Sequence, residues 1–205
     1  MSVPDAWGLK YDEVVGLTWL AYKGQGTPGR WTFPNSGSSW NLVSVFERGS
    51  FRAVLVKGKK TVLSFSGTDD AADWGDNIGQ GLTGVSWQYL YALRVANANA
   101  ADIVVGHSLG GGLASYVAIY GGRPCATVNP APLNVNLASG VGMIKNGNLV
   151  VNYVAAGEAL DLLDAAMMNM RRVGKIYNVP SSAGWNPVDK HLLGNLKGFS
   201  APVKG

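Results

Sequence analysis

The sequence predicts an α/β protein with a mostly parallel central sheet, helices on both faces and an antiparallel β-meander near the N-terminus. In the second half of the chain, short apolar runs alternate with helical periodicities, as parallel strands joined by crossover helices require. Apolar residues make up 47% of the 205 residues, which is enough for a sizeable core. Because no internal repeat or linker divides the chain, we expect a single domain over residues 1–205.

The first half of the chain carries the predicted meander. A helix is predicted over residues 14–23, and a loop rich in Gly, Pro and Ser follows over residues 24–39. Three β-rich runs come next, separated by Arg48-Gly49 and Lys57-Gly58 turns. These predicted strands cover residues 42–47, 52–57 and 61–66.

The second half alternates between helices and strands. Helices are predicted over residues 87–96, 109–120 and 159–173, with a last short helix starting at His191. Strands are predicted over residues 102–106, 125–129, 149–155 and 175–179. Leu160, Leu163, Met167 and Met170 would share one face of the helix over 159–173, either as core or as the wall of an acyl groove.

Composition and charge exclude several classes of function. One cysteine, Cys125, excludes an internal disulfide, and two histidines leave little for a metal site, so we expect no metal and no organic cofactor. The net charge of +4 is spread along the chain, which argues against nucleic acid and allows transient contact with a membrane surface. Neither a membrane-spanning run nor a Sec signal is predicted, so we expect a cytoplasmic protein or export by a signal-independent route.

Residues 106–110 (GHSLG) carry the chemistry that the sequence predicts. They fit G-x-S-x-G, a sharp strand-to-helix turn that presents a serine hydroxyl at the edge of a sheet. An apolar strand precedes the turn, and three consecutive glycines begin the helix after it, where helix and strand must cross closely. We therefore predict Ser108 as a nucleophile.

A serine hydroxyl needs a base, usually an imidazole that a carboxylate orients. His107 is adjacent to Ser108 and projects from the turn in another direction, so His191 is the predicted base. The acid is expected between the two in the chain. Glu158 lies just beyond a predicted strand, at the edge where catalytic groups gather, and Asp161, three residues further, is the alternative.

The oxyanion of an acyl-transfer reaction needs hydrogen-bond donors that are already in place. One predicted donor is the backbone amide of Leu109, the residue after the nucleophile. The second is Thr68, because Gly67 before it allows the backbone at the end of an earlier strand to approach closely.

Residues 65–79 (FSGTDDAADWGDNIG) and, further on, residues 103–114 (IVVGHSLGGGLA) resemble the class 3, fungal-type lipases of the α/β-hydrolase fold. Asp73, Trp74 and Asp76 match the element that follows the oxyanion strand in these lipases. The resemblance implies the site residues Ser108, His191, Glu158, Thr68 and Leu109 in the roles given above. Two departures stand out: the acid in these lipases is usually Asp, and residues 76–84 leave room for only a reduced lid.

The predicted function is therefore a serine carboxylic-ester hydrolase that acts on lipid or short-chain esters through an acyl-enzyme, as a lipase, phospholipase or esterase. Alternatives are a phospholipase effector that acts on target membranes, an acyltransferase with the same nucleophile, and a non-catalytic lipid-binding protein of the same fold. The sequence does not determine the acyl chain, the headgroup or the oligomeric state.

Overall fold

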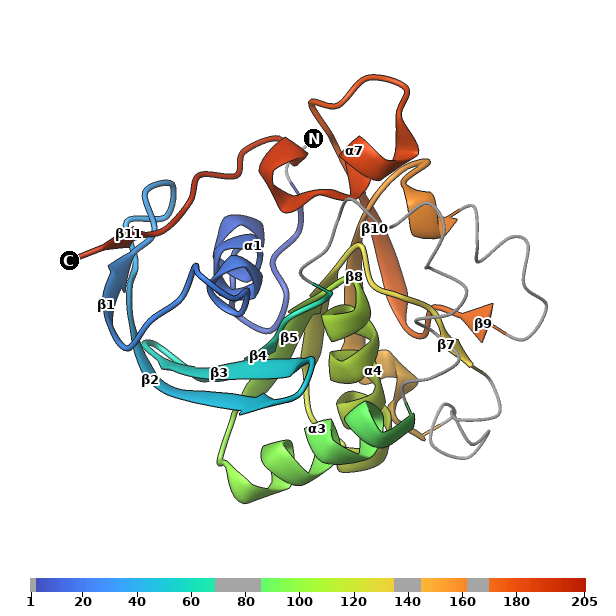
Figure 1. Cartoon of the computed structure of the whole chain (residues 1–205). Coiled ribbons are helices and arrows are strands. Elements are labelled where there is room, and N and C mark those ends of the chain that lie inside the picture. The colour runs from blue at the N-terminus through green and yellow to red at the C-terminus, as the bar shows by residue number, and fades with distance from the viewer. Residues whose placement is uncertain (1–2, 69–85, 135–144, 162–169) are drawn as a thin grey trace.

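The computed structural model describes residues 3–68, 86–134, 145–161 and 170–205. Among these residues, nine strands form one mixed sheet with helices on both faces (Figure 1). In chain order the strands of this sheet are β1 (Gly29–Thr32), β2 (Ser39–Arg48), β3 (Phe51–Lys57), β4 (Thr61–Phe65), β5 (Ile103–His107), β6 (Cys125–Val128), β8 (Val150–Ala155), β10 (Lys175–Val179) and β11 (Val203–Lys204). The predicted α/β class is confirmed.

The sheet has an antiparallel part and a parallel part. Across the sheet the order is β10-β8-β6-β5-β4-β3-β2-β1-β11. Strands β1 to β4 pair antiparallel, which confirms the predicted meander. Strands β4, β5, β6, β8 and β10 pair parallel, which confirms the mostly parallel sheet of the second half.

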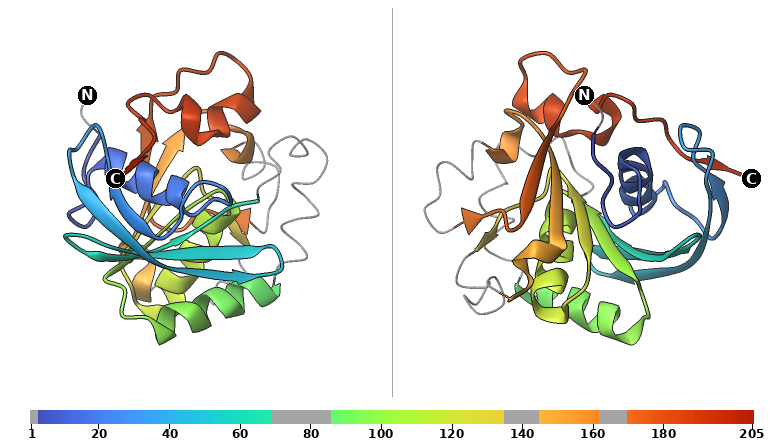
Figure 2. Two further views of the ribbon diagram at one scale, coloured as in Figure 1. Left: turned by 60° about the vertical axis from the view of Figure 1, so that its left-hand side comes forward. Right: turned by 180° about the vertical axis from the view of Figure 1, so that it is seen from behind.

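Helices cover the two faces of the sheet (Figure 2). Helix α1 (Tyr11–Leu20) packs on one face, and α3 (Ser86–Ala98) and α4 (Leu109–Gly121) pack on the other. Side chains along β3 alternate accordingly: Val54 and Val56 join the core under α1, whereas Ala53 and Leu55 join the core under α3 and α4. Three short helices lie wholly within the described residues: η2 (Gly147–Leu149), α7 (Pro187–His191) and η3 (Leu193–Asn195).

Two sequence predictions are wrong in the first and last parts of the chain. β1 lies in the segment predicted as a loop, because Trp31 packs against Trp19 and the strand pairs with β2 despite its Gly- and Pro-rich surroundings. The short helix predicted to start at His191 instead ends there, since Asn186 caps its N-terminus by accepting a hydrogen bond from the Val188 amide at 3.0 Å.

The predicted helix over residues 159–173 is also wrong at its end. Met170–Arg171 form β9, which pairs antiparallel with β7 (Leu133–Asn134) in a second, two-stranded sheet. Residues 162–169, and with them Leu163 and Met167 of the predicted apolar face, lie outside the described residues. The predicted flap over residues 76–84 and the residues Asp73 and Trp74 lie outside them as well.

The carboxyl ends of the parallel strands meet at one edge of the sheet, above α4 in Figure 1. β4 ends two residues before Gly67, β5 ends at the residue before Ser108, and β8 ends three residues before Glu158. This topology brings the predicted site residues to a single edge. Among the described residues, no helix combines the length and the apolar character needed to cross a membrane.

Candidate active site

The turn between β5 and α4 holds Ser108 in a strained backbone conformation. Ser108 has φ 59° and ψ −130°, which non-glycine residues rarely adopt. A Cβ on Gly106 would lie 2.1 Å from the Gly110 carbonyl oxygen, and one on Gly110 would lie 2.2 Å from the Phe65 carbonyl oxygen. Glycine at both positions is therefore required for the helix to start this close to β4 and β5.

The end of β4 lies directly against this turn. A Cβ on Gly67 would lie 2.9 Å from the Ser108 Cβ and 3.1 Å from the His107 carbonyl oxygen. Thr68, the next residue, is exposed. Leu109 is the first residue of α4, so its backbone N–H has no hydrogen-bond acceptor within the helix. Both predicted oxyanion donors thus belong to segments that border Ser108.

His191 and Glu158 form a buried pair. His191 Nδ1 lies 2.5 Å from Glu158 Oε2, and the two side chains are 1% and 0% exposed. The Leu160 amide donates to the same carboxyl oxygen at 3.0 Å. Burial raises the pKa of Glu158, and the charge of Arg172 opposes this rise. Burial and then the charge of Arg172 lower the pKa of His191 well below 6.5.

Two side chains at the carboxyl ends of β5 and β6, those of His107 and Asn129, fix the backbone of His191. The rings of His107 and His191 lie 4.7 Å apart between centroids, which places the His191 ring beside the serine turn. His107 Nε2 contacts the His191 carbonyl oxygen at 2.9 Å, and Asn129 Nδ2 donates to the same oxygen at 2.9 Å. Because a carbonyl only accepts, His107 carries its proton on Nε2, and its Nδ1 accepts from the Tyr22 hydroxyl at 2.5 Å.

Burial keeps His107 neutral, and the contacts of Asn129 assign that residue a role that sequence reasoning missed. Burial, followed by the charge of His191, lowers the pKa of His107 to about 3. Asn129 has φ 41°, a conformation that Asn tolerates better than most residues, and its Oδ1 accepts from the Ala155 amide at 2.8 Å. The only signal in the sequence was an Asn at the end of the apolar strand predicted over residues 125–129.

Arg172 is the second residue that sequence reasoning missed. Its guanidinium binds Glu158 through Nη2, Asp161 through Nη1 and the Pro130 carbonyl through Nε at 3.0 Å. The Arg172 side chain is 1% exposed, whereas that of Asp161 is 36% exposed. The structure therefore brings Glu158 to His191 and places Asp161 on the far side of the arginine.

Replacing Arg172 with methionine is expected to lower the free energy of unfolding by about 3 to 5 kcal/mol, because Glu158 would keep its burial and lose its cationic partner. Chemical denaturation measures this difference. The matched control is Arg171→Met, an exposed neighbour, for which we expect a change of about 0.5 kcal/mol or less. Equal stability of the two variants would contradict a structural role for the buried ion pair.

Comparisons with known proteins identify the family of the chain. A family model described as phospholipase-like, the Tle-like phospholipase domain, matches residues 27–194, which include Ser108, Glu158 and His191. The chain belongs to this family of Tle-like phospholipase domains.

The chain is also similar to a known phospholipase. The chain is 32% identical over 146 residues to an extracellular phospholipase A1 of Serratia liquefaciens. The match covers 68% of this chain and 42% of that protein, so the chain spans less than half the length of this relative. The predicted membership of a lipase or phospholipase family is confirmed, and the narrower resemblance to class 3 fungal-type lipases stays a prediction.

Proposed function

We propose that the protein is a serine hydrolase that cleaves a fatty-acyl ester of phospholipids, with Ser108 as nucleophile, His191 as base and Glu158 as the acid that orients His191. Residues 1–205 would then form one α/β-hydrolase-like domain related to the lipases. Two observations from outside the site support the substrate class: the match to Tle-like phospholipase domains and the similarity to a phospholipase A1.

The proposed reaction proceeds in two acyl transfers. His191 takes the proton from Ser108 Oγ as the oxygen attacks the ester carbonyl, and the amides of Leu109 and Thr68 bind the oxyanion that forms. Breakdown of this intermediate transfers the proton from His191 to the departing lysophospholipid oxygen and leaves an acyl ester on Ser108. Water, deprotonated by His191, then attacks that ester, which releases the fatty acid and restores the serine.

The contact between His191 and Glu158, next to the serine turn, is the observation that carries this proposal. A 2.5 Å contact to Nδ1 fixes the tautomer with the proton on that nitrogen, so Nε2 keeps the lone pair that a base needs. The carboxyl group is itself fixed by Leu160 N–H and Arg172. His107 and Asn129 hold the backbone of the same histidine.

The lowered pKa of His191 predicts activity at acidic pH. The reaction needs the neutral imidazole, so kcat/KM falls only as the pH drops through the pKa of His191 in the free enzyme. Because burial and Arg172 lower that pKa, we expect the acid limb to have its midpoint below the 6.5 of an unperturbed imidazole. A rate profile on an uncharged ester measures it, and a midpoint at or above 6.5 would contradict the neutral, buried base.

Product analysis tests the substrate class. Vesicles of phosphatidylcholine with different acyl chains at its two positions are incubated with the protein, and mass spectrometry identifies the fatty acid and the lysophospholipid released. We expect release of the sn-1 chain, as the name of the similar phospholipase A1 suggests. Release of the sn-2 chain would change the regiochemistry, and hydrolysis of water-soluble esters alone would replace the phospholipase with an esterase. Lysophospholipid formation that requires an added acyl acceptor would favour the acyltransferase.

A further inference from the structure

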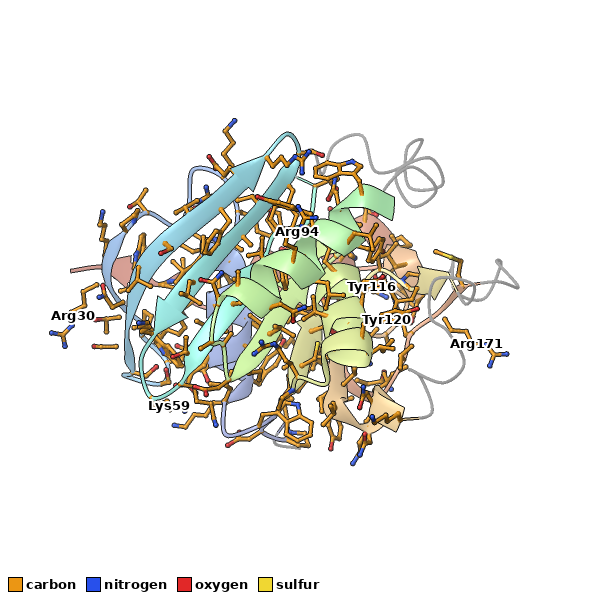
Figure 3. All side chains as sticks on the ribbon, turned by 90° about the horizontal axis from the view of Figure 1, so that it is seen from below. Arg30, Lys59, Arg94, Tyr116, Tyr120 and Arg171 are labelled. Carbon is orange, nitrogen blue, oxygen red and sulfur yellow. The ribbon has the colours of Figure 1, made fainter. Side chains whose placement is uncertain are left out.

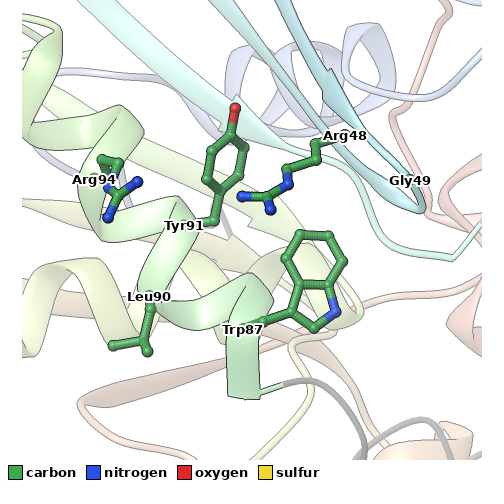
Figure 4. Close-up of a pocket in the computed structure, with 6 residues that line it drawn as sticks. All are labelled: Arg48, Gly49, Trp87, Leu90, Tyr91 and Arg94. Atoms are coloured by element: carbon green, nitrogen blue, oxygen red, sulfur yellow. The ribbon is translucent and has the colours of Figure 1, made fainter.

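An open cavity of about 430 Å³ lies on the outer face of α3, away from the residues assigned above (Figure 4). We call the residues that line it the α3 patch: Arg48, Gly49, Trp87, Leu90, Tyr91 and Arg94. Four of them lie on α3 at spacings i, i+3, i+4 and i+7, so they share one helical face. Trp87 is 38% exposed and Leu90 63% exposed, so apolar surface borders the charges.

The α3 patch presents two positive charges. The Arg48 guanidinium carbon lies 5.6 Å from the centre of the Trp87 ring and 5.2 Å from that of Tyr91, so the two rings hold it in place (Figure 4). Arg94 lies exposed on the next turn of α3, on the outward face seen in Figure 3. Glu47 pairs with Arg52, and within the described part of the chain neither Arg48 nor Arg94 forms an ion pair. An anionic partner would complement both charges.

The patch is fixed to the same edge of the sheet as Ser108. The β2–β3 turn that carries Arg48 is joined to α3 by the hydrogen bond from Gln88 Nε2 to Ser50 Oγ at 2.8 Å. β3 runs antiparallel to β4. The amide of Ser66, the residue before Gly67, donates a hydrogen bond to the Arg52 carbonyl at 3.0 Å. The turn therefore lies at the carboxyl end of β4, next to the strand end that borders Ser108.

The combination of arginine, indole, phenol and leucine matches the surface of an anionic phospholipid membrane. Guanidinium groups bind phosphate oxygens with two parallel hydrogen bonds, Trp and Tyr favour the depth of the headgroups, and an exposed Leu reaches the acyl region. An acidic protein would satisfy the arginines but leave the exposed indole and leucine without a matching apolar environment. The chemistry of the patch therefore favours a lipid surface.

We propose that the α3 patch docks the protein on anionic phospholipid bilayers, with Arg48 and Arg94 on the phosphates and Trp87 and Leu90 in the interface. This inference rests on the proposed function and deepens it, because docking at this edge would bring Ser108 to the lipid. β3, which follows the β2–β3 turn, pairs with β4, whose carboxyl end borders Ser108.

Vesicle sedimentation tests the docking surface, with all variants made in the Ser108→Ala background so that the lipid stays intact. The vesicles contain phosphatidylcholine alone or equal parts of phosphatidylcholine and phosphatidylglycerol. We expect binding to the anionic vesicles, weakened by added salt, and a loss of about thirtyfold in the partition coefficient for Arg48→Gln/Arg94→Gln. Leu90→Ser is expected to weaken binding at both low and high salt, since its contribution is apolar.

A matched control separates the patch from net charge. Arg30→Gln/Arg171→Gln removes the same number of exposed arginines from other parts of the surface (Figure 3) and is expected to bind within about threefold of the parent. Thermal denaturation checks that each variant folds. Equal binding of the patch and control variants would overturn the proposal. So would a change in sedimentation coefficient confined to the patch variant, with unchanged vesicle binding, since that identifies a second copy of the chain as the occupant.

The docking test and the function test can fail separately. Vesicle binding is measured without hydrolysis, so a wild-type protein that releases no fatty acid but binds through the α3 patch would contradict the proposed function alone. A protein that hydrolyses phospholipid while its patch variants bind like the control would contradict the docking surface alone.

Discussion

Replacing Ser108 with alanine is expected to reduce the rate of fatty acid release by about four to six orders of magnitude, because the acyl acceptor is removed while the oxyanion donors and the base remain. The fold should persist, because the close packing of the turn depends on the neighbouring glycines, and alanine at 108 does not change them. The free energy of unfolding should change by less than about 1 kcal/mol.

Fatty acid release from vesicles, together with labelling by a serine-reactive phosphonate, measures the effect of Ser108→Ala. Ser64→Ala is the matched control, because Ser64 is a buried serine on the adjacent strand β4. We expect that control to keep a rate within about twofold of wild type and to be labelled normally. Wild-type turnover in Ser108→Ala would remove the assigned nucleophile, even if the phospholipase activity itself were real.

Replacing Glu158 with glutamine is expected to lower kcat by about three to four orders of magnitude, because the amide cannot supply the negative charge that stabilises a protonated His191. Asp161→Asn is the matched comparison and should stay within about fivefold of wild type. Asp161 is 36% exposed and contacts Arg172 and the Gly157 amide, whereas the carboxylate that contacts the imidazole of His191 is that of Glu158.

Since Glu158→Gln also removes the carboxylate that partners Arg172, its stability must be measured beside its rate. Glu158→Asp keeps the charge on a shorter side chain, and its kcat is expected to be at least tenfold higher than that of Glu158→Gln. This recovery distinguishes a catalytic charge from a structural one. A near-normal rate for Glu158→Gln with a large loss for Asp161→Asn would transfer the role of the acid to Asp161.

The strands of the parallel part were predictable because each is a short apolar run that its own sequence identifies. β10 has the predicted bounds of residues 175–179, β6 and β8 are each one residue shorter at one end than predicted, and β5 is shifted by one residue at both ends. The serine turn was predictable for a different reason: Gly106 and Gly110 are required by contacts of about 2 Å that any side chain would violate, so the motif encodes its own geometry.

Other elements depend on partners that are distant in the chain. β1 exists because β2 and β11 pair with it, although its own segment is rich in Gly and Pro. β9 forms where helical periodicity was expected, because residues near 133 supply its pairing partner. Pairings of this kind leave no local signal, and local propensity is overridden by the tertiary contact.

The sequence by itself determined the α/β class and the serine turn at residue 108, and it led to the proposed roles of Ser108 and His191. Tertiary structure alone decided which carboxylate meets His191, because Glu158 and Asp161 are three residues apart and both have the chemistry required. Arg172 separates them: it binds both carboxylates in a buried position, and only Glu158 has its second oxygen directed to the imidazole. The pairing of charges in a buried site depends on distances between segments, which a linear sequence does not record.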